Sequence, residues 1–163
     1  MMDQLLLAST VLAALGSGLI AGNFFAFSAY MMTALDRLPV PQGISAMQSI
    51  TAAILSPVFL VAFLGTAALA GILGIAAPLR WSEPDAIYLL AGSLLYLNGP
   101  FGVTLLRNAP LNKTLAGLKP DSAEAKKQWK QFVPAWTAWN HVRWITSLAA
   151  AACFTMALVK QAS

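Results

Sequence analysis

A long run without any charged side chain separates Asp3 from Asp36 and constrains this chain more than any other feature. A helix needs about 20 predominantly apolar residues to cross a bilayer, so this run is long enough to span one and to project beyond it. A cleaved signal peptide would begin with basic residues and would contain a shorter apolar stretch, whereas Asp3 is the only charge ahead of this run. We therefore predict that residues 4–35 form a first transmembrane helix.

The composition of the whole chain agrees with a membrane protein. Of its 163 residues, 58% are hydrophobic and 10% are charged, whereas about 25% are charged in a typical soluble domain. So few charged side chains cannot cover the surface of a soluble fold of this length. The same figures exclude an intrinsically disordered chain, a collagen and a disulfide scaffold, and the length suits a single domain over residues 1–163.

Further apolar segments follow the first one. Residues 43–77 are uncharged and contain Pro57 near their middle, which predicts a kink at that proline. We expect the three later spans over residues 58–77, 86–106 and 140–159. The polar stretch 107–130 predicts a loop and then a helix that begins near Ala123. The predicted fold is all-α: an integral membrane four-helix bundle with a long polar loop and an amphipathic helix between spans three and four.

The basic side chains are distributed unevenly between the two ends of the predicted spans. Eight lie at the ends that follow spans one and three, and two, Arg80 and Lys160, lie at the opposite ends. Because basic residues gather on the cytoplasmic side, we expect the long loop in the cytoplasm and both termini outside, in a bacterial inner membrane. Six of the ten basic residues fall between Arg107 and Lys130, beside a hydrophobic segment. This placement indicates contacts with membrane lipids and argues against a nucleic-acid partner.

Polar side chains inside the spans are candidates for function, because an unpaired polar group is costly in a bilayer. Asn23 and Asn98 are the deepest of them. In one interpretation, Asn98 satisfies backbone groups freed at Pro100, and Asn23 bonds between helices that Gly18 and Gly22 allow to approach closely. In the other, both amides bind a substrate at the deep end of a pocket. Helical spacing predicts that the apolar lining of this deep part consists of Phe24, Phe27 and Tyr96.

A second group of polar side chains gathers where span three ends and span four begins. Antiparallel helices would place its members at a similar depth. They are Thr104, Arg107, Asn108 and Asn112 on one side and Asn140, His141 and Arg143 on the other, walled by Trp136, Trp139 and Trp144. Amides and a guanidinium can hold phenolate or carbonyl oxygens, while indole rings stack on an aromatic ligand. The alternative is that the tryptophans and arginines are interfacial anchors.

The sequence offers little for a metal site. His141 is the single histidine, no carboxylate lies inside a predicted span, and Cys153 is distant in the sequence. A metal site needs several such ligands, so we expect no metal held by side chains and no cofactor. A heme with His141 as its one axial ligand is left open.

Several of these residues fall into two motifs. They are Thr104-x3-Asn108-x-Pro110-Leu111-Asn112 and Trp136-Thr137-x-Trp139-Asn140-His141-x-Arg143, with supporting patterns over residues 21–28 and 42–48. Over residues 16–158 the chain resembles the anthrone oxygenase-like family of small four-helix membrane proteins, although Thr51 stands where the family pattern has Asn. The resemblance implies a four-helix membrane bundle. It also implies a relation to fungal members that are linked to the oxidation of anthrones to anthraquinones.

From these residues and the resemblance we predict a cofactor-independent oxygenase that acts on a hydrophobic phenolic aromatic substrate of the anthrone type. The substrate enters from the membrane, and His141 acts as the base. Arg143, Asn108 and Asn112 stabilise the developing oxyanion. The remaining contacts with the substrate are expected from Trp136, Trp139, Asn23, Asn98, Asn140, Phe24, Phe27 and Tyr96.

The alternative is a non-enzymatic membrane protein that binds a lipid or a quinone-like ligand, or that scaffolds partners. In either case we expect a cavity between the cytoplasmic halves of the four helices, with Arg143 directed inward. The sequence leaves open the identity of the substrate, whether the chain is an enzyme at all, and whether it forms a homo-oligomer.

Overall fold

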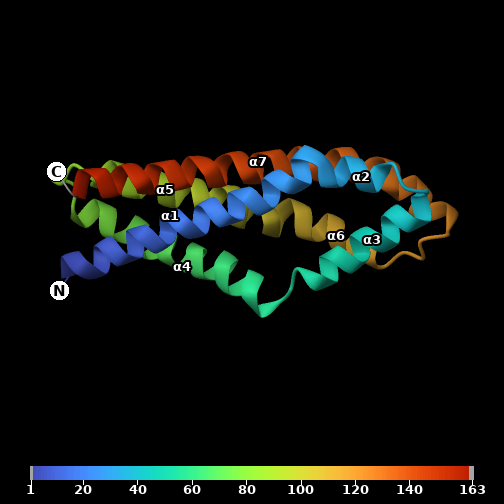
Figure 1. Ribbon diagram of the computed structural model, residues 1–163, viewed down its shortest axis with the longest axis horizontal. Helices are drawn as coiled ribbons and strands as arrows, with labels where there is room; N and C mark the ends of the chain where they lie inside the picture. The colour runs from blue at the N-terminus through green and yellow to red at the C-terminus, as the bar shows by residue number, and fades with distance from the viewer. Residues whose placement is uncertain (1, 162–163) are drawn as a thin grey trace.

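The structure, a computed structural model, describes residues 2–161, and this part of the chain is helical apart from short connections (Figure 1). In chain order its elements are α1 (Met2–Ala26), the π-helix η1 (Phe27–Met31), α2 (Met32–Asp36), α3 (Val40–Ala53), α4 (Pro57–Leu79), α5 (Ala86–Tyr96), the π-helix η2 (Leu97–Asn108), α6 (Ala109–Ala116) and α7 (Ala123–Gln161). They form four antiparallel rods: α1–η1–α2, α3–α4, α5–η2–α6, and α7 alone (Figure 1).

Each rod contains a helix that is long and apolar enough to cross a membrane. Within the described residues these candidate spans are Gln4–Asp36, Pro57–Leu79, Ala86–Ala116 and Ala123–Gln161. The predicted all-α membrane bundle of four helices is therefore confirmed.

The second rod is interrupted at the position where the sequence predicts only a kink. α3 ends at Ala53 and α4 begins at Pro57, and the junction bows away from the other rods (Figure 1). Proline lacks a backbone N–H, so it is suited to the first turn of a helix, where that donor needs no partner. Oγ of Ser56 accepts a 3.4 Å hydrogen bond from the backbone N–H of Phe59 and caps the new helix. Pro57 therefore begins a helix instead of bending one.

The third rod extends further than the sequence predicts. The predicted span ends at residue 106 and a loop follows, whereas the chain remains helical through η2 and α6 to Ala116. Pro100 lies within η2, whose wide turns accommodate an irregular hydrogen-bond pattern, and Pro110 lies in the first turn of α6. Neither proline ends the rod, so the non-helical connection shrinks to residues 117–122.

The fourth rod is one uninterrupted helix of 39 residues. It begins at Ala123, as the sequence predicts, and Oγ of Ser122 accepts a 3.1 Å hydrogen bond from the backbone N–H of Ala125. Pro134 lies inside the helix without ending it. α7 is therefore long enough to contact every other rod along the bundle.

The buried apolar side chains form two clusters that share α7. The first, here called the span core, joins α1, α4, α5 and the C-terminal half of α7, and includes Ile20, Leu73, Leu89 and Phe154. The second, here called the end core, joins η1, α2, α3, α6 and the N-terminal half of α7, and includes Ile44, Met47, Leu115, Trp129 and Phe132. The cavity described below lies where these two clusters meet.

Small residues bring the rods together at positions other than the predicted pair. A Cβ atom at Gly18 or Gly22 would meet no atom of another element within 4 Å, so these glycines do not make the expected close approach. A Cβ atom at Gly99 would instead overlap the side chain of Thr146 on α7. A Cβ atom at Gly16 would likewise overlap the side chain of Thr66 on α4. Glycine is therefore needed for close contact between the third and fourth rods and between the first and second rods.

Candidate functional site

A cavity of about 410 Å³ lies at the junction of the span core and the end core, with wall residues from all four rods. Aromatic rings form much of its apolar wall, from Phe24, Phe27, Phe59, Phe63 and Trp136. Exposed leucines also border it, Leu55 and Leu64 from the second rod and Leu105 from the third. The cavity therefore opens at the bundle surface between these rods, and its size and lining suit a small hydrophobic molecule.

Arg143 is the charged group buried in this wall, with 4% of its surface exposed. Nη2 donates a 2.8 Å hydrogen bond to Oδ1 of Asn140, and Nη1 donates a 3.3 Å bond to Oγ1 of Thr104. The guanidinium carbon lies 4.1 Å from the ring centre of Phe24 and 4.9 Å from that of Trp136. The structure of residues 2–161 contains no carboxylate within ion-pair distance of Arg143, and Nε has no hydrogen-bond partner there. Arg143 thus points into the bundle as an uncompensated cation.

Asn140 holds Arg143 and joins the fourth rod to the first. Its side chain is fully buried, and Nδ2 donates hydrogen bonds to the backbone oxygen of Phe24 at 2.6 Å and to Oγ of Ser28 at 2.7 Å. Its Oδ1 accepts the bond from Arg143. With both ends of the amide engaged, Asn140 fixes the guanidinium relative to α1.

Asn108 and Asn112 lie one helical turn apart on the third rod and both face α7. Nδ2 of Asn108 donates a 3.1 Å hydrogen bond to the backbone oxygen of Trp136, while its buried Oδ1 has no partner within the described chain. Oδ1 of Asn112 accepts a 2.8 Å bond from the indole N–H of Trp136. Arg143, Asn108, Asn112 and Trp136, which the sequence groups together, therefore share one cavity wall.

His141 and Trp139 lie outside the cavity, on other faces of α7. His141 is exposed, and its Nδ1 accepts a 3.3 Å hydrogen bond from the indole N–H of Trp144. Residues two apart on a helix point about 200° away from each other, so His141 cannot face the same space as Arg143. Trp139 packs against the guanidinium of Arg107, 4.8 Å from its ring centre. The expected grouping of His141 and Trp139 with Arg143 is therefore not found in the structure.

Three residues predicted for the deep part of the site also lie apart from the cavity wall. Asn98 is exposed, and its Nδ2 donates a 2.8 Å hydrogen bond to the backbone oxygen of Leu94 in its own rod. Asn23 is partly buried, and its Nδ2 has no partner among the described residues. Tyr96 belongs to the span core, where its hydroxyl donates a 3.1 Å bond to the backbone oxygen of Phe63. Of the predicted deep residues, the cavity is lined by Phe24 and Phe27.

The second rod lines part of the cavity with residues that are not among the predicted site residues. Phe59 and Phe63 lie one turn apart just after Pro57 and stack with ring centres 5.7 Å apart. An aromatic pair at a spacing of four residues shares one helix face, which is the signal that could have identified it. Met47 lines the cavity from α3.

The cavity is electropositive. Of the residues that line it within the described chain, two are charged, Arg143 and Lys113, and both are cations. Lys113 is exposed, so its charge is hydrated, whereas that of Arg143 is buried. Among residues 2–161, no group of three histidine, cysteine, aspartate or glutamate side chains lies close enough together to hold a metal ion.

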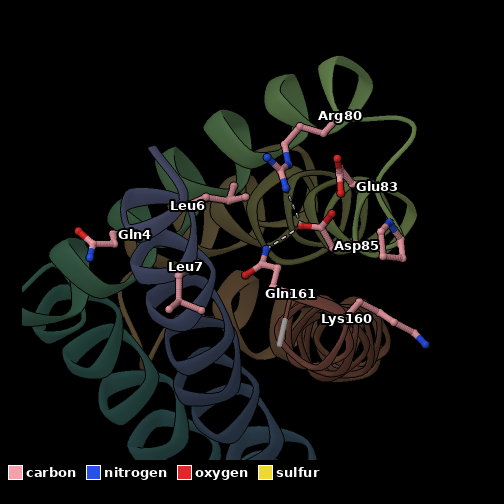
Figure 2. A pocket seen from close by; sticks show the side chains of 9 residues that line it. Gln4, Leu6, Leu7, Arg80, Glu83, Asp85, Lys160 and Gln161 are labelled. Atoms are coloured by element: carbon pink, nitrogen blue, oxygen red, sulfur yellow. Dashed lines mark hydrogen bonds and ion pairs between the residues drawn. The ribbon is translucent and has the colours of Figure 1, made fainter. Parts of the chain in front are cut away.

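A second hollow, of about 450 Å³, lies at the opposite end of the bundle, beside the connection between α4 and α5 (Figure 2). Oδ2 of the buried Asp85 accepts a 2.8 Å hydrogen bond from Nε2 of Gln161 and lies 3.8 Å from Nη2 of Arg80. Lys160 points away from this group (Figure 2). These contacts tie the α4–α5 connection to the end of α7, and we assign them a structural role.

Comparison with known proteins gives one match. The family model described as anthrone oxygenase matches residues 47–153, which is well over half of the chain and includes most of the residues that line the cavity. No curated protein and no solved structure matches the chain.

Proposed function

The chain belongs to the anthrone oxygenase family, and from this premise we propose that it is a membrane oxygenase for a hydrophobic phenolic aromatic substrate of the anthrone type. The observation that carries the proposal is the cavity between the rods. Its aromatic wall suits a flat polycyclic body, and Arg143, Asn108 and Asn112 offer polar contacts to oxygens at its edge.

The proposed reaction converts the activated CH₂ group of an anthrone into a carbonyl with O₂ as the oxidant. Both C–H bonds break, and one atom of O₂ becomes the carbonyl oxygen. The other atom of O₂ leaves as water with the two hydrogens. The carbon loses four electrons and O₂ gains four, so the step is balanced without a further reductant.

Arg143 and the side-chain N–H groups of Asn112 stabilise negative charge on the substrate oxygen as the CH₂ group loses its proton, while Oδ1 of Asn108 accepts a hydrogen bond from a substrate hydroxyl. Electrostatic stabilisation of this kind is strong in a site from which water is excluded, and Arg143 is already buried there. The rings of Phe24 and Trp136 hold the aromatic body beside the guanidinium. His141 receives no role as base, because it lies on the outer surface of α7.

We also propose a placement in the membrane. The shortest candidate span is α4, with 23 residues, or about 35 Å at 1.5 Å per residue, close to the thickness of a bilayer core. The other spans are longer, so the end core projects beyond the bilayer on the side that carries most basic residues. Because basic residues gather on the cytoplasmic side, this side faces the cytoplasm and both termini lie outside. The membrane is a bacterial inner membrane. The cavity then lies at the membrane surface, where a lipid-soluble substrate can enter between the second and third rods.

The test is an oxidation assay with the purified full-length protein in non-ionic detergent. Emodin anthrone is incubated under O₂, and quinone absorbance is followed against a protein-free sample that measures autoxidation. We expect a protein-dependent rate that falls by about 100-fold in Arg143→Gln. Arg107→Gln is the matched control, since Arg107 contacts Trp139 outside the cavity. No excess over autoxidation in the wild-type protein would overturn the proposal.

The second candidate function is a non-enzymatic carrier of a quinone-like ligand or lipid, or a scaffold for partners. A carrier is favoured by one observation: the described cavity wall contains no carboxylate or imidazole that could take the substrate proton, and its charged groups are Arg143 and Lys113. The same assay distinguishes the oxygenase from a carrier, because a carrier would bind emodin and leave the autoxidation rate of emodin anthrone unchanged.

A further inference from the structure

We propose that the cavity binds its ligand as an anion, with Arg143 as the counter-ion. The ligand class is an aromatic compound with one ionised oxygen and at least one neutral hydroxyl. The proposal rests on the proposed function for the aromatic body of the ligand and on the surroundings of Arg143 for its charge.

Within residues 2–161, the cavity wall has no negative charge that could balance Arg143. Arg143 is 4% exposed, and its partners, the Asn140 amide oxygen and the Thr104 hydroxyl, are neutral. A buried ion loses its hydration, and contact with a ring face such as those of Phe24 and Trp136 compensates for only a small part of that loss. Within residues 2–161, the charged groups that face the cavity are Lys113 from α6 and Arg143 from α7, and both are positive. A negatively charged ligand supplies the compensation that the described chain does not.

Two buried polar atoms on the same wall are available to a ligand. Among the described residues, Nε of Arg143 is a buried donor without a partner, and Oδ1 of Asn108 is a buried acceptor without a partner. Buried polar atoms are nearly always hydrogen-bonded, because an unpaired one has lost its hydration without compensation. A ligand that accepts from Arg143 and donates to Asn108 needs an anionic oxygen and a hydroxyl. A simple fatty acid provides the first and lacks the second.

The proposal also explains how oxidation can begin without a protein base in the cavity. The enol form of an anthrone carries an O–H group, and breaking that bond sends the proton to water. The electron pair left on oxygen delocalises onto the ring carbon that was the CH₂ group, so the bound enolate is also the carbanion that reacts with O₂. By stabilising this anion, Arg143 favours loss of the proton to water, so that the base role predicted for His141 is not needed.

The experiment measures the ionisation of a bound ligand and needs no turnover. Emodin, the hydroxylated quinone, is the probe, because a phenolate absorbs at longer wavelength than its phenol. It is titrated with pH in the presence of full-length protein in a non-ionic detergent. We expect the pKa of bound emodin to lie at least one unit below its value in empty micelles, which is a tenfold preference for the anion.

Two variants distinguish the effect of the buried charge of Arg143 on ligand binding from the effect of the net positive charge of the protein. Arg143→Gln should lose the shift and weaken emodin binding about tenfold at a pH where the free ligand is ionised, whereas Arg107→Gln should keep both. Unsubstituted anthraquinone cannot ionise, so its affinity should stay within about twofold in every variant, which also shows that the cavity is folded. If Arg143→Gln fails to fold, Arg143→Lys keeps the charge and should retain the shift.

An unshifted pKa of emodin in the wild-type protein, or a shift that survives in Arg143→Gln, would overturn the proposal. Its failure is distinguishable from failure of the oxygenase function. A lowered pKa without oxidation of emodin anthrone supports anion binding and removes the enzyme. Oxidation of emodin anthrone together with an unshifted pKa of bound emodin supports the enzyme and removes anion binding.

Discussion

The indole N–H of Trp136 donates a 2.8 Å hydrogen bond to Oδ1 of Asn112 and so joins α7 to α6 along one wall of the cavity. The same indole ring lies 4.9 Å from the guanidinium carbon of Arg143, and its centre lies 5.4 Å from that of Phe27. One hydrogen bond therefore orients a ring that contacts both the charged and the apolar parts of the site.

Breaking this hydrogen bond from either side should have overlapping effects. We expect Trp136→Phe and Asn112→Ala each to lower the free energy of unfolding, and the double variant to lose less than the sum. The difference should be about 0.5–1 kcal/mol, because the two changes remove the same bond. Thermal unfolding in detergent measures it. Trp136→Phe combined with Thr155→Ala, an exposed position far along α7, serves as the additive control. Additivity in the first pair would contradict the contact.

Asn140 should be the amide on which the bundle depends most. Asn140→Ala removes two donated bonds to the first rod and the accepted bond from Arg143, so we expect a loss of about 2–3 kcal/mol. Asn98→Ala is the matched control, because that exposed side chain bonds only within its own rod, and its effect should stay within about 0.5 kcal/mol. Equal losses of stability in the two variants would contradict the role of Asn140 as the buried amide that joins the first and fourth rods.

His141→Ala should leave quinone formation nearly unchanged. The imidazole is exposed and bonded to Trp144 on the outside of α7, where it cannot reach a substrate in the cavity. Removal of a general base typically slows a reaction by 10²–10⁴-fold, whereas we expect less than about a twofold change. The measurement is the initial rate of quinone formation over a range of pH. A rate loss of 100-fold would restore His141 as the base.

The sequence predicts the fold well because a bilayer imposes a simple rule on each span. Long apolar runs such as residues 4–35 are expected to form membrane-length helices, so the four helices follow from the hydropathy and the scarcity of charge in each run. The cavity residues Asn108, Asn112 and Arg143 are likewise predictable, since two spaced motifs on antiparallel helices meet at one depth.

The features that the sequence does not predict depend on the direction in which each side chain points around its helix and on irregularities of the helix backbone. His141 stands two residues from Arg143 in the sequence, but helix geometry turns its side chain to the opposite side. Pro57 and Pro100 look alike as helix breakers, yet one starts a helix and the other lies inside a π-helix. Sequence spacing alone does not distinguish these outcomes. A backbone carbonyl that a proline leaves without its helical N–H donor finds another hydrogen-bond partner only where the neighbouring rods provide one.

The contact between the third and fourth rods should depend on Gly99. A Cβ atom there would overlap the side chain of Thr146, so Gly99→Ala must push α7 away or force a strained rotamer. We expect a loss of about 1–3 kcal/mol, as for other overpacked sites. Gly22→Ala is the control, because its Cβ would meet open space and alanine favours the helix by up to about 1 kcal/mol. Thermal unfolding of both variants should give shifts of opposite sign, and adding Thr146→Gly to Gly99→Ala should recover part of the loss. If alanine is tolerated equally at both glycines, the close packing of these rods is wrong.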